Sequence, residues 1–383
     1  MSHKLITRGG KAALSVAAAL ILAGLAAGCE GQAQKREIEQ RVGTKAEGYP
    51  LPVREDYYGA AVADKDNAWV VGSYGTILKI TDNGSKVEMQ PTPTRSSLFA
   101  ASASGPNDCV VVGEDGLVLR TTDGGKTWEK ADVPKAVDQN LLAIARGKDP
   151  SQIWAVGPEA TLIHSADGGK TWVDQSLHKD ETLNGVTFLD DTTGWVVGEF
   201  GVIKKTTDGG KTWTEMDKVT DLPTYFQNVT PQEAYLLGIP KLTEQDLYLF
   251  NSAWTSPQNG YIASTGGLIL ETNDGGANWK AVRTGTENTL FSVATPAGHS
   301  AVVVGILGTL ARQDGGKWAV DQKTSADIYT WLRCVKFSPD ASLGIVTGGK
   351  GTVLVSHDGG TSWQMIDKAT IAAAGNESPH AKG

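Results

Sequence analysis

Residues 121–128 read TTDGGKTW, and residues 206–213 repeat this octapeptide without a change. Close variants occur four more times, as SADGGKTW at 165–172, TNDGGANW at 272–279, QDGGKW at 313–318 and SHDGGTSW at 356–363. A degenerate copy, TDNGSKVEM, starts at Thr81 and lacks the tryptophan. We call each of these stretches a box. A signature kept this closely is either an active site or a structural element, and its repetition distinguishes the two.

The boxes recur with a nearly constant spacing. Their aspartates are Asp82, Asp123, Asp167, Asp208, Asp274, Asp314 and Asp358. Successive aspartates lie 41, 44, 41, 66, 40 and 44 residues apart, and all of these intervals but one suit the blades of a β-propeller. The chain therefore contains seven repeat units, and the interval of 66 residues indicates an insertion at about residues 222–246.

The fourth unit shows the strands of one repeat. An apolar run at 183–189 is followed by GWVVG at 194–198 and by VIKKTT at 202–207, which leads into the box and a short segment after it. Four strands of about five residues, with turns of similar length, fill a repeat of about 40 residues. The sequence thus predicts an all-β fold, a seven-bladed β-propeller of four-stranded antiparallel blades.

The residue types of the box suit a turn between the third and fourth strands. Aspartate accepts backbone N–H bonds across the turn, glycine adopts a positive φ, and tryptophan packs its ring back against the sheet. The pattern resembles the Asp-box repeats of sialidase-like and related propellers, where the box lies away from the substrate. A catalytic site is made once and not once per blade, so we interpret the boxes as structural. Their tryptophans are Trp128, Trp172, Trp213, Trp279, Trp318 and Trp363.

The N-terminus has the pattern of a targeting segment. Lys4, Arg8 and Lys11 precede an apolar run at 12–27, which ends in LAAGC with Cys29 as its last residue. This ending resembles a bacterial lipobox, and the resemblance implies a signal peptide at 1–28, export and lipidation of Cys29. An ordinary secretory signal with a chance cysteine is the alternative.

The lipobox reading also predicts where the protein resides. Several acyl chains on Cys29 would hold it on a bacterial membrane, facing the periplasm, and Glu30 favours the outer membrane by analogy with known sorting. Residues 29–56 are then the lipidated cysteine and a flexible tether, 57–367 the propeller, and 368–383 a flexible tail. Either residues 42–56 or 362–367 could complete the last blade.

Composition excludes several classes of function. The net charge is −8, with 35 lysines and arginines in 383 residues, which disfavours nucleic acid as a partner. The histidines show no short metal-ligand spacing, so we expect no metal and no cofactor. Cys109 and Cys334 lie in apolar strands, where buried free thiols are common.

A closer resemblance rests on the lipobox, the seven units, and the stretches GWVVGEFGVIKKTTDGGKTW at 194–213 and SPDASLGIVTGGKGTVLVSHDGGTSW at 338–363. Together they resemble the photosystem II stability and assembly factor family, including its bacterial relatives outside phototrophs. The resemblance implies a non-enzymatic factor that holds membrane-protein intermediates, and a protein that is a monomer on its own. Basic residues on one face are thought to act in that family; the arginines here are Arg95, Arg120, Arg146, Arg283, Arg312 and Arg333.

A carbohydrate-active propeller is the alternative function. A sialidase needs an arginine cluster and a tyrosine–glutamate pair, and no suitable context surrounds Arg54. Another glycosidase would need two carboxyl groups at about 5–10 Å across the funnel. Glu114 and Glu199 occupy equivalent hairpins, VGEDG and VGEFG, but other units carry different residues there, which favours ordinary polar turn residues.

The face opposite the boxes is the candidate partner-binding surface. In a propeller the connection from the fourth strand to the next blade emerges on the same face as the hairpin between the second and third strands. The insertion should therefore lie beside these hairpins, and aromatic residues are enriched in interface cores; the alternative is that it only packs on blades four and five. The candidate residues are Tyr225, Phe226 and Tyr235 of the insertion, and Tyr74, Glu114, Glu199, Phe200 and Lys350 of the hairpins.

Overall fold

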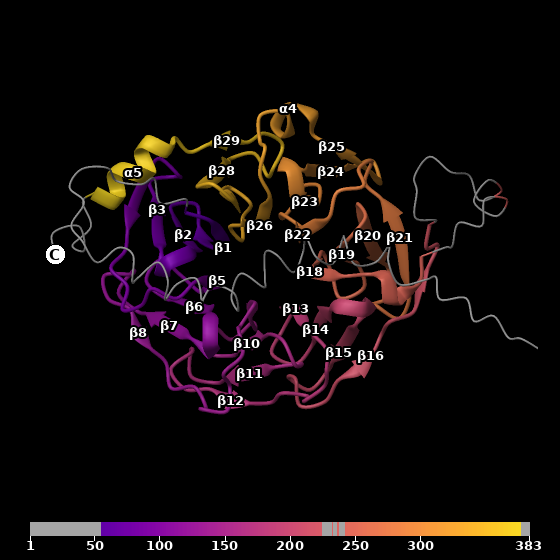
Figure 1. Ribbon diagram of the computed structural model, residues 1–383, viewed down its shortest axis with the longest axis horizontal. Coiled ribbons are helices and arrows are strands. Elements are labelled where there is room, and N and C mark those ends of the chain that lie inside the picture. The colour runs from indigo at the N-terminus through magenta and orange to yellow at the C-terminus, as the bar shows by residue number, and fades with distance from the viewer. Residues whose placement is uncertain (1–54, 224–231, 233–235, 237–241, 377–383) are drawn as a thin grey trace, which may run out of the picture. The chain divides into compact units, whose positions relative to one another are not determined.

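The structure is a computed structural model that describes residues 55–223, 232, 236 and 242–376. The predicted signal peptide, Cys29 and nearly all of the tether lie outside the described residues, as do Tyr225, Phe226 and Tyr235. The described strands form seven sheets, each built from consecutive strands and antiparallel apart from one edge strand. Figure 1 shows these sheets as the blades of a ring, so the predicted fold, an all-β seven-bladed propeller, is confirmed.

Blades 1 to 4 each contain four antiparallel strands in chain order. Blade 1 is β1 (Tyr57–Asp64), β2 (Asn67–Gly72), β3 (Ile77–Thr81) and β4 (Lys86–Met89). Blade 2 is β5 (Leu98–Ala103), β6 (Cys109–Gly113), β7 (Val118–Thr121) and β8 (Glu129–Lys130). Blade 3 is β9 (Ala143–Arg146), β10 (Ile153–Val156), β11 (Leu162–Ser165) and β12 (Val173–Asp174). Blade 4 is β13 (Leu183–Phe188), β14 (Gly194–Gly198), β15 (Ile203–Thr206) and β16 (Thr214–Glu215).

Blades 5 to 7 follow the same order, and blade 5 gains a fifth strand. Blade 5 is β18 (Leu249–Trp254), β19 (Gly260–Ser264), β20 (Leu268–Thr272) and β21 (Trp279–Arg283), with β17 (Val219–Thr220) parallel to β21. Blade 6 is β22 (Leu290–Ala294), β23 (Val302–Gly305), β24 (Leu310–Asp314) and β25 (Lys317–Val320). Blade 7 is β26 (Leu332–Phe337), β27 (Gly344–Gly348), β28 (Thr352–Ser356) and β29 (Gln364–Met365). Two helices, α4 (Gln322–Ser325) and α5 (Lys368–Asn376), follow blades 6 and 7.

The core is divided into one apolar cluster for each pair of neighbouring blades. The second strand of each blade is buried on both faces, which explains why it reads as an unbroken apolar run. In blade 4, for example, Trp195 and Val197 pack toward blade 5, whereas Val196 packs toward blade 3. Every blade therefore depends on two neighbours for its burial.

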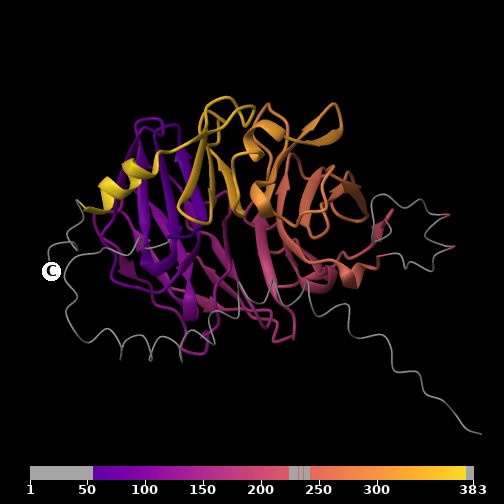
Figure 2. The ribbon, with the colours of Figure 1, turned by 45° about the horizontal axis from the view of Figure 1, so that its top comes forward.

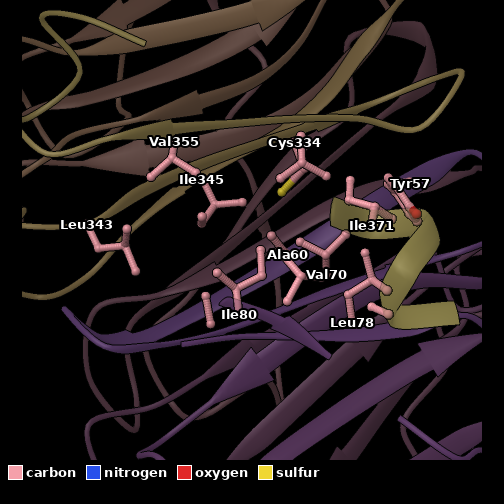
Figure 3. Close-up of a cluster of buried hydrophobic side chains, with 14 residues drawn as sticks. Tyr57, Ala60, Val70, Leu78, Ile80, Cys334, Leu343, Ile345, Val355 and Ile371 are labelled. Carbon is pink, nitrogen blue, oxygen red and sulfur yellow. The ribbon is translucent and has the colours of Figure 1, made fainter. Parts of the chain in front are cut away.

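The ring closes where blade 7 packs on blade 1. Figure 3 shows Tyr57, Ala60 and Val70 of blade 1 facing Cys334 and Ile345 of blade 7. The strands of blade 1 and those of blade 7 come from separate stretches of the chain. The outer strand of blade 7 is β29, which lies within residues 362–367, so this segment completes the last blade.

Helix α5 covers this closing contact from outside. We expected residues 368–383 to form a flexible tail, but Lys368–Asn376 are helical, and α5 contacts β4 of blade 1. Figures 1 and 2 show the helix beside this blade. Ile371 and Ala374 are buried in the cluster between blades 7 and 1. The helix therefore links the end of blade 7 to the outer strand of blade 1.

Five boxes share one hydrogen-bonded turn. In blade 2, the Thr121 hydroxyl donates to Asp123 at 2.8 Å and accepts from the Gly125 N–H at 2.9 Å. The backbone N–H and the hydroxyl of Thr127 both donate to the Asp123 carboxylate, at 3.0 and 2.7 Å. The equivalent carboxylates Asp167, Asp208, Asp274 and Asp358 accept the same kinds of bond.

Asp82 and Asp314 depart from this pattern. Among the described residues, neither carboxylate accepts a hydrogen bond, and the strands around them join in tighter turns. The box of blade 6 is one residue shorter between its aspartate and its tryptophan than the complete boxes. That of blade 1 has Lys86 at the position that Thr127 occupies in blade 2, and it lacks the tryptophan. Trp318 instead donates to Glu271 of the neighbouring blade at 2.8 Å.

The box carboxylates acquire low pKa values from these bonds. The hydroxyl and backbone N–H of Thr127 hold the pKa of Asp123 at about 2, below its ordinary value near 3.9. A carboxylate whose pKa is lower in the folded state contributes stability above its unfolded pKa, and this contribution is lost as the pH falls through the folded pKa. The boxes therefore make the propeller sensitive to acid between about pH 4 and pH 2.

We predict that Asp123→Asn lowers the melting temperature at neutral pH by about 2 °C and makes it fall less steeply between pH 4 and pH 2. The physical reason is that the amide cannot replace both acceptor oxygens of the carboxylate. Thermal melts over this pH range test it, with Asp82→Asn as the matched control, because the Asp82 carboxylate accepts no hydrogen bond among the described residues and only its backbone carbonyl accepts a bond from a side chain. Equal effects of the two substitutions would contradict the structural role of the box.

We also predict that Ile371→Ala destabilises the propeller, since Ile371 is 6% exposed and lies between blades 7 and 1. Truncating a buried isoleucine costs about 2 kcal/mol or more, or about 4 °C in a domain of this size. Thr370→Ala, at the exposed neighbouring position, is the control. Identical melting temperatures for the two variants would show that α5 does not help to close the ring.

Candidate functional site

The hairpins between the second and third strands share an unusual backbone. In blades 1, 2, 4 and 6 they are short 3-10 turns, η1 (Ser73–Gly75), η2 (Glu114–Gly116), η3 (Glu199–Gly201) and η5 (Ile306–Gly308). The middle residue of each turn is not glycine and yet has a positive φ between 54° and 57°, as has Lys350 of blade 7. Such backbone is uncommon outside glycine, asparagine and aspartate.

Each hairpin is tied to the connection that enters the next blade. The N–H of Gly116 donates to the carbonyl of Gln139, and that of Gly201 to Leu247, both at 2.8 Å. At the closure of the ring, the N–H of Gly351 donates to Glu55 at 2.7 Å. The connections and these hairpins therefore share one side of the ring, as predicted, and we call it the hairpin face.

Exposed apolar side chains gather on the hairpin face. Tyr74, Phe200 and Leu307, at equivalent positions in three hairpins, are 65%, 53% and 66% exposed, and Tyr329 of a connection is 80% exposed. Phe200 also leans on Tyr248, with ring centroids 5.6 Å apart. Large exposed apolar groups are typical of a binding site where they adjoin one another, as Leu307 and Tyr329 do in one hollow.

A hollow of about 400 Å³ lies between the hairpins of blades 6 and 7. Leu307 and Tyr329 line it together with Trp331, and Lys350 lies at its rim beside Asp56, whose carboxylate accepts the Lys350 N–H at 2.8 Å. Lys350, a predicted partner-binding residue, thus lies beside two exposed apolar residues that the sequence analysis did not select.

Glu114 and Glu199 lie on the hairpin face but in different blades. They begin η2 of blade 2 and η3 of blade 4, with blade 3 between them. Burial raises the pKa of Glu199, and a hydrogen bond from the Thr182 hydroxyl opposes this shift. Both glutamates are the first residue of their turn.

The innermost strands carry a feature that the sequence analysis missed. In six blades the register shifts at the second residue of the first strand, as in a β-bulge. A bulge leaves one residue without a partner and redirects its side chain. The bulged residues are Tyr58, Phe99, Asn184, Phe250, Phe291 and Arg333.

The bulged side chains meet beside the hairpin face, because each bulge stands next to the last residue of the second strand. The rings of Phe250 and Phe291 are 5.1 Å apart, and those of Tyr58 and Phe99 are 5.6 Å apart. The Arg333 guanidinium lies 4.7 Å from the Phe291 ring and 5.7 Å from the Phe250 ring. The signal in the sequence is a leucine directly before the bulged residue in five of these strands.

The described part of the chain offers no group of three histidine, cysteine, aspartate or glutamate residues that could hold a metal ion. Cys109 and Cys334 are buried free thiols, as predicted. Burial raises the pKa of Cys109 to about 12 and also raises that of Cys334. Within the described ranges, no helix is both long and apolar enough to span a bilayer.

These features define a seven-bladed Asp-box propeller whose hairpin face carries its exposed apolar groups. A family model described as photosynthesis system II assembly factor YCF48 matches residues 40–136 and 131–238, just over half of the chain. The chain therefore belongs to the YCF48 assembly factor family.

Solved structures have the same fold. A structure described as YCF48 bound to D1 peptide is 19% identical and covers 82% of this chain and 98% of its own, with a TM-score of 0.62. YCF48 from Cyanidioschyzon merolae is 18% identical over 80% of this chain and 97% of its own, with a TM-score of 0.61. The propeller domain of Doa1, at 12% identity, covers 82% of this chain and 95% of its own, with a TM-score of 0.59. No curated protein sequence matches the chain significantly.

Proposed function

We propose that this protein is a non-catalytic assembly factor that holds a membrane protein, or an intermediate of a membrane protein complex, against its hairpin face. Membership of the YCF48 family supports this role, as does a similar structure in which YCF48 holds a D1 peptide. The observation that carries the proposal is the exposure of Tyr74, Phe200 and Leu307 at equivalent hairpin positions.

Backbone conformation strengthens this reading of the hairpins. A non-glycine residue with a positive φ costs about 1 kcal/mol or more relative to ordinary backbone. Asparagine or glycine would relieve that cost, and both would lack a large apolar group. Tyr74, Phe200 and Leu307 instead combine strained backbone with exposed apolar surface, and neither property stabilises the folded protein. Binding supplies a reason for the combination.

We further propose that acylated Cys29 anchors the propeller to a bacterial membrane, on its periplasmic side, and that this membrane is the outer membrane. The lipobox-like LAAGC and the polar segment after it support this proposal. An anchor of this kind restricts the propeller to the surface in which its partner is embedded, and so raises the effective concentration of the two.

The face can be tested with Phe200→Asn and Leu307→Asn combined in one chain. Asparagine tolerates positive φ, so the variant should fold, and we predict that it recovers its membrane partner poorly in a detergent pull-down. Val173→Asn with Met365→Asn is the matched control, because these two residues are exposed apolar positions on outer strands. Undiminished recovery by the hairpin variant, with both variants folded, would contradict the proposed face.

The anchor can be tested with Cys29→Ser. We predict that the native chain needs detergent for extraction from membranes, because its acyl chains are buried in lipid, whereas the serine variant is released as soluble material or is exported poorly. Fractionation followed by mass spectrometry of the N-terminal peptide measures both properties. Equal dependence of the two chains on detergent would refute lipid anchoring through Cys29.

A further inference from the structure

Arg333 is a half-buried cation at the inner rim of the ring. It occupies the bulge of β26, and its guanidinium lies over the rings of Phe291 and Phe250. Such contacts between a cation and the face of an aromatic ring are favourable, but they leave the N–H donors of the guanidinium unsatisfied. The position therefore leaves these donors available to an acceptor from a partner.

No acceptor is found within the described residues. Arg120 and Arg146 both approach the carboxylate of Asp108, whereas Arg333 forms no ion pair or hydrogen bond in the part of the chain that the structure describes. Burial lowers the pKa of Arg333, and the ionisable neighbours that oppose this shift are Cys334 and Tyr58. An arginine remains charged in proteins, and a charge partly removed from water without a counter-ion is unfavourable.

An apolar path leads from Arg333 to the hollow between blades 6 and 7. Tyr58, whose hydroxyl is one of the neighbours of Arg333, stacks on Trp331 with ring centroids 5.7 Å apart and planes 3° apart. Trp331 lines the hollow together with Leu307 and Tyr329. Tyr58 and Trp331 therefore connect the surroundings of the guanidinium to the hollow.

The position of the Trp331 ring is fixed by a close approach to the backbone. A Cβ atom at Gly349 would lie 2.8 Å from this ring and 2.5 Å from the Thr330 hydroxyl. A side chain at residue 349 would displace the ring, so glycine permits the stack on Tyr58. The aromatic wall beside Arg333 is thus built in advance of any partner.

We propose that Arg333 binds the carboxylate of an acidic side chain in an extended peptide segment of the partner, while a neighbouring apolar side chain of that segment occupies the hollow beside Trp331. This inference rests on the proposed function and specifies the chemistry of the segment that is bound. An aspartate or glutamate supplies the missing acceptor, and a guanidinium binds a carboxylate through two parallel hydrogen bonds. Because apolar side chains line much of the hollow, the residue next to the acid in the bound segment should also be apolar.

Random peptide libraries, displayed with both ends fused and selected on the full-length chain in detergent, test this chemistry without the membrane complex. We expect enriched peptides to share an acidic residue next to an aliphatic or aromatic one. A selected peptide, synthesised with blocked ends, should bind about tenfold more weakly when its acid is changed to the amide, as for the loss of a charged hydrogen bond.

Arg333→Met provides the second arm. The acidic and amide forms of the peptide should bind this variant equally weakly, whereas Arg333→Lys should retain part of the preference for the acid. Arg312→Met is the matched control, since it removes the same charge from β24, the third strand of blade 6, and it should bind as the unchanged chain does. The melting temperature of Arg333→Met should stay the same or rise, because an unpaired charge has been removed.

Several outcomes would overturn the inference. They are enrichment of peptides without an acid, no enrichment at all, recognition only of peptides with a free C-terminal carboxylate, or an undiminished preference for the acid in Arg333→Met. A lower melting temperature of Arg333→Met together with unchanged peptide binding would show a purely structural arginine. If membrane pull-down through the hairpin face succeeds while the peptide arms fail, the proposed function stands and the role of Arg333 falls.

Discussion

Closure of the ring is the constraint on which the rest of the structure depends. Each blade buries its two faces only against two neighbours, so a missing contact between blades 7 and 1 would expose an apolar face at both ends of the sheet series. The cluster around Tyr57, Val70 and Ile345 closes this gap, and Ile371 of α5 adds to it from outside. The backbone bond from Gly351 to Glu55 joins the same two blades on the hairpin face.

A closed ring separates two kinds of surface chemistry. On one side, five boxes use their carboxylates to satisfy their own turns, as Asp123 does with Thr127. These carboxylates are already hydrogen-bonded within the protein, and the same arrangement recurs in five blades. On the hairpin face, equivalent positions carry different side chains, such as Phe200, Leu307 and Lys350. Repetition thus provides the scaffold, whereas variation between blades provides the surface that can recognise a partner.

The architecture of the ring was predictable from the sequence. The spacing of the box aspartates gave the number of blades, and runs such as GWVVG located the second strands, because a strand buried on both faces must be apolar throughout. Helix α5 was not predictable, since the alanine-rich segment 368–376 has no strong apolar periodicity and depends on Ile371 finding the cluster between two blades. Asp82 and Asp314 showed that an aspartate in a shortened or degraded box does not make the bonds of a complete one.

The site was predictable only in part. The hairpin positions of Tyr74, Phe200 and Lys350 followed from the repeat, because equivalent turns must lie on one face. Tyr329 was missed because it belongs to a connection outside the repeat pattern. In the sequence Arg333 is one of several scattered arginines. What distinguishes it from the others is its place at a register shift, with its guanidinium over the Phe291 ring. Pairing register is a property of the folded sheet and is not visible in the residue order.

The central claim is that the hairpin face binds the partner, whereas the box turns only stabilise the blades. Hydrogen–deuterium exchange of the native chain, alone and with its co-purified membrane partner, tests this claim. The account predicts that the partner slows exchange at residues 73–76, 199–202, 306–309 and 329–333 and leaves the box turns, such as residues 121–128, unchanged. Protection of the box turns, with the hairpins exchanging as they do in the free protein, would contradict it.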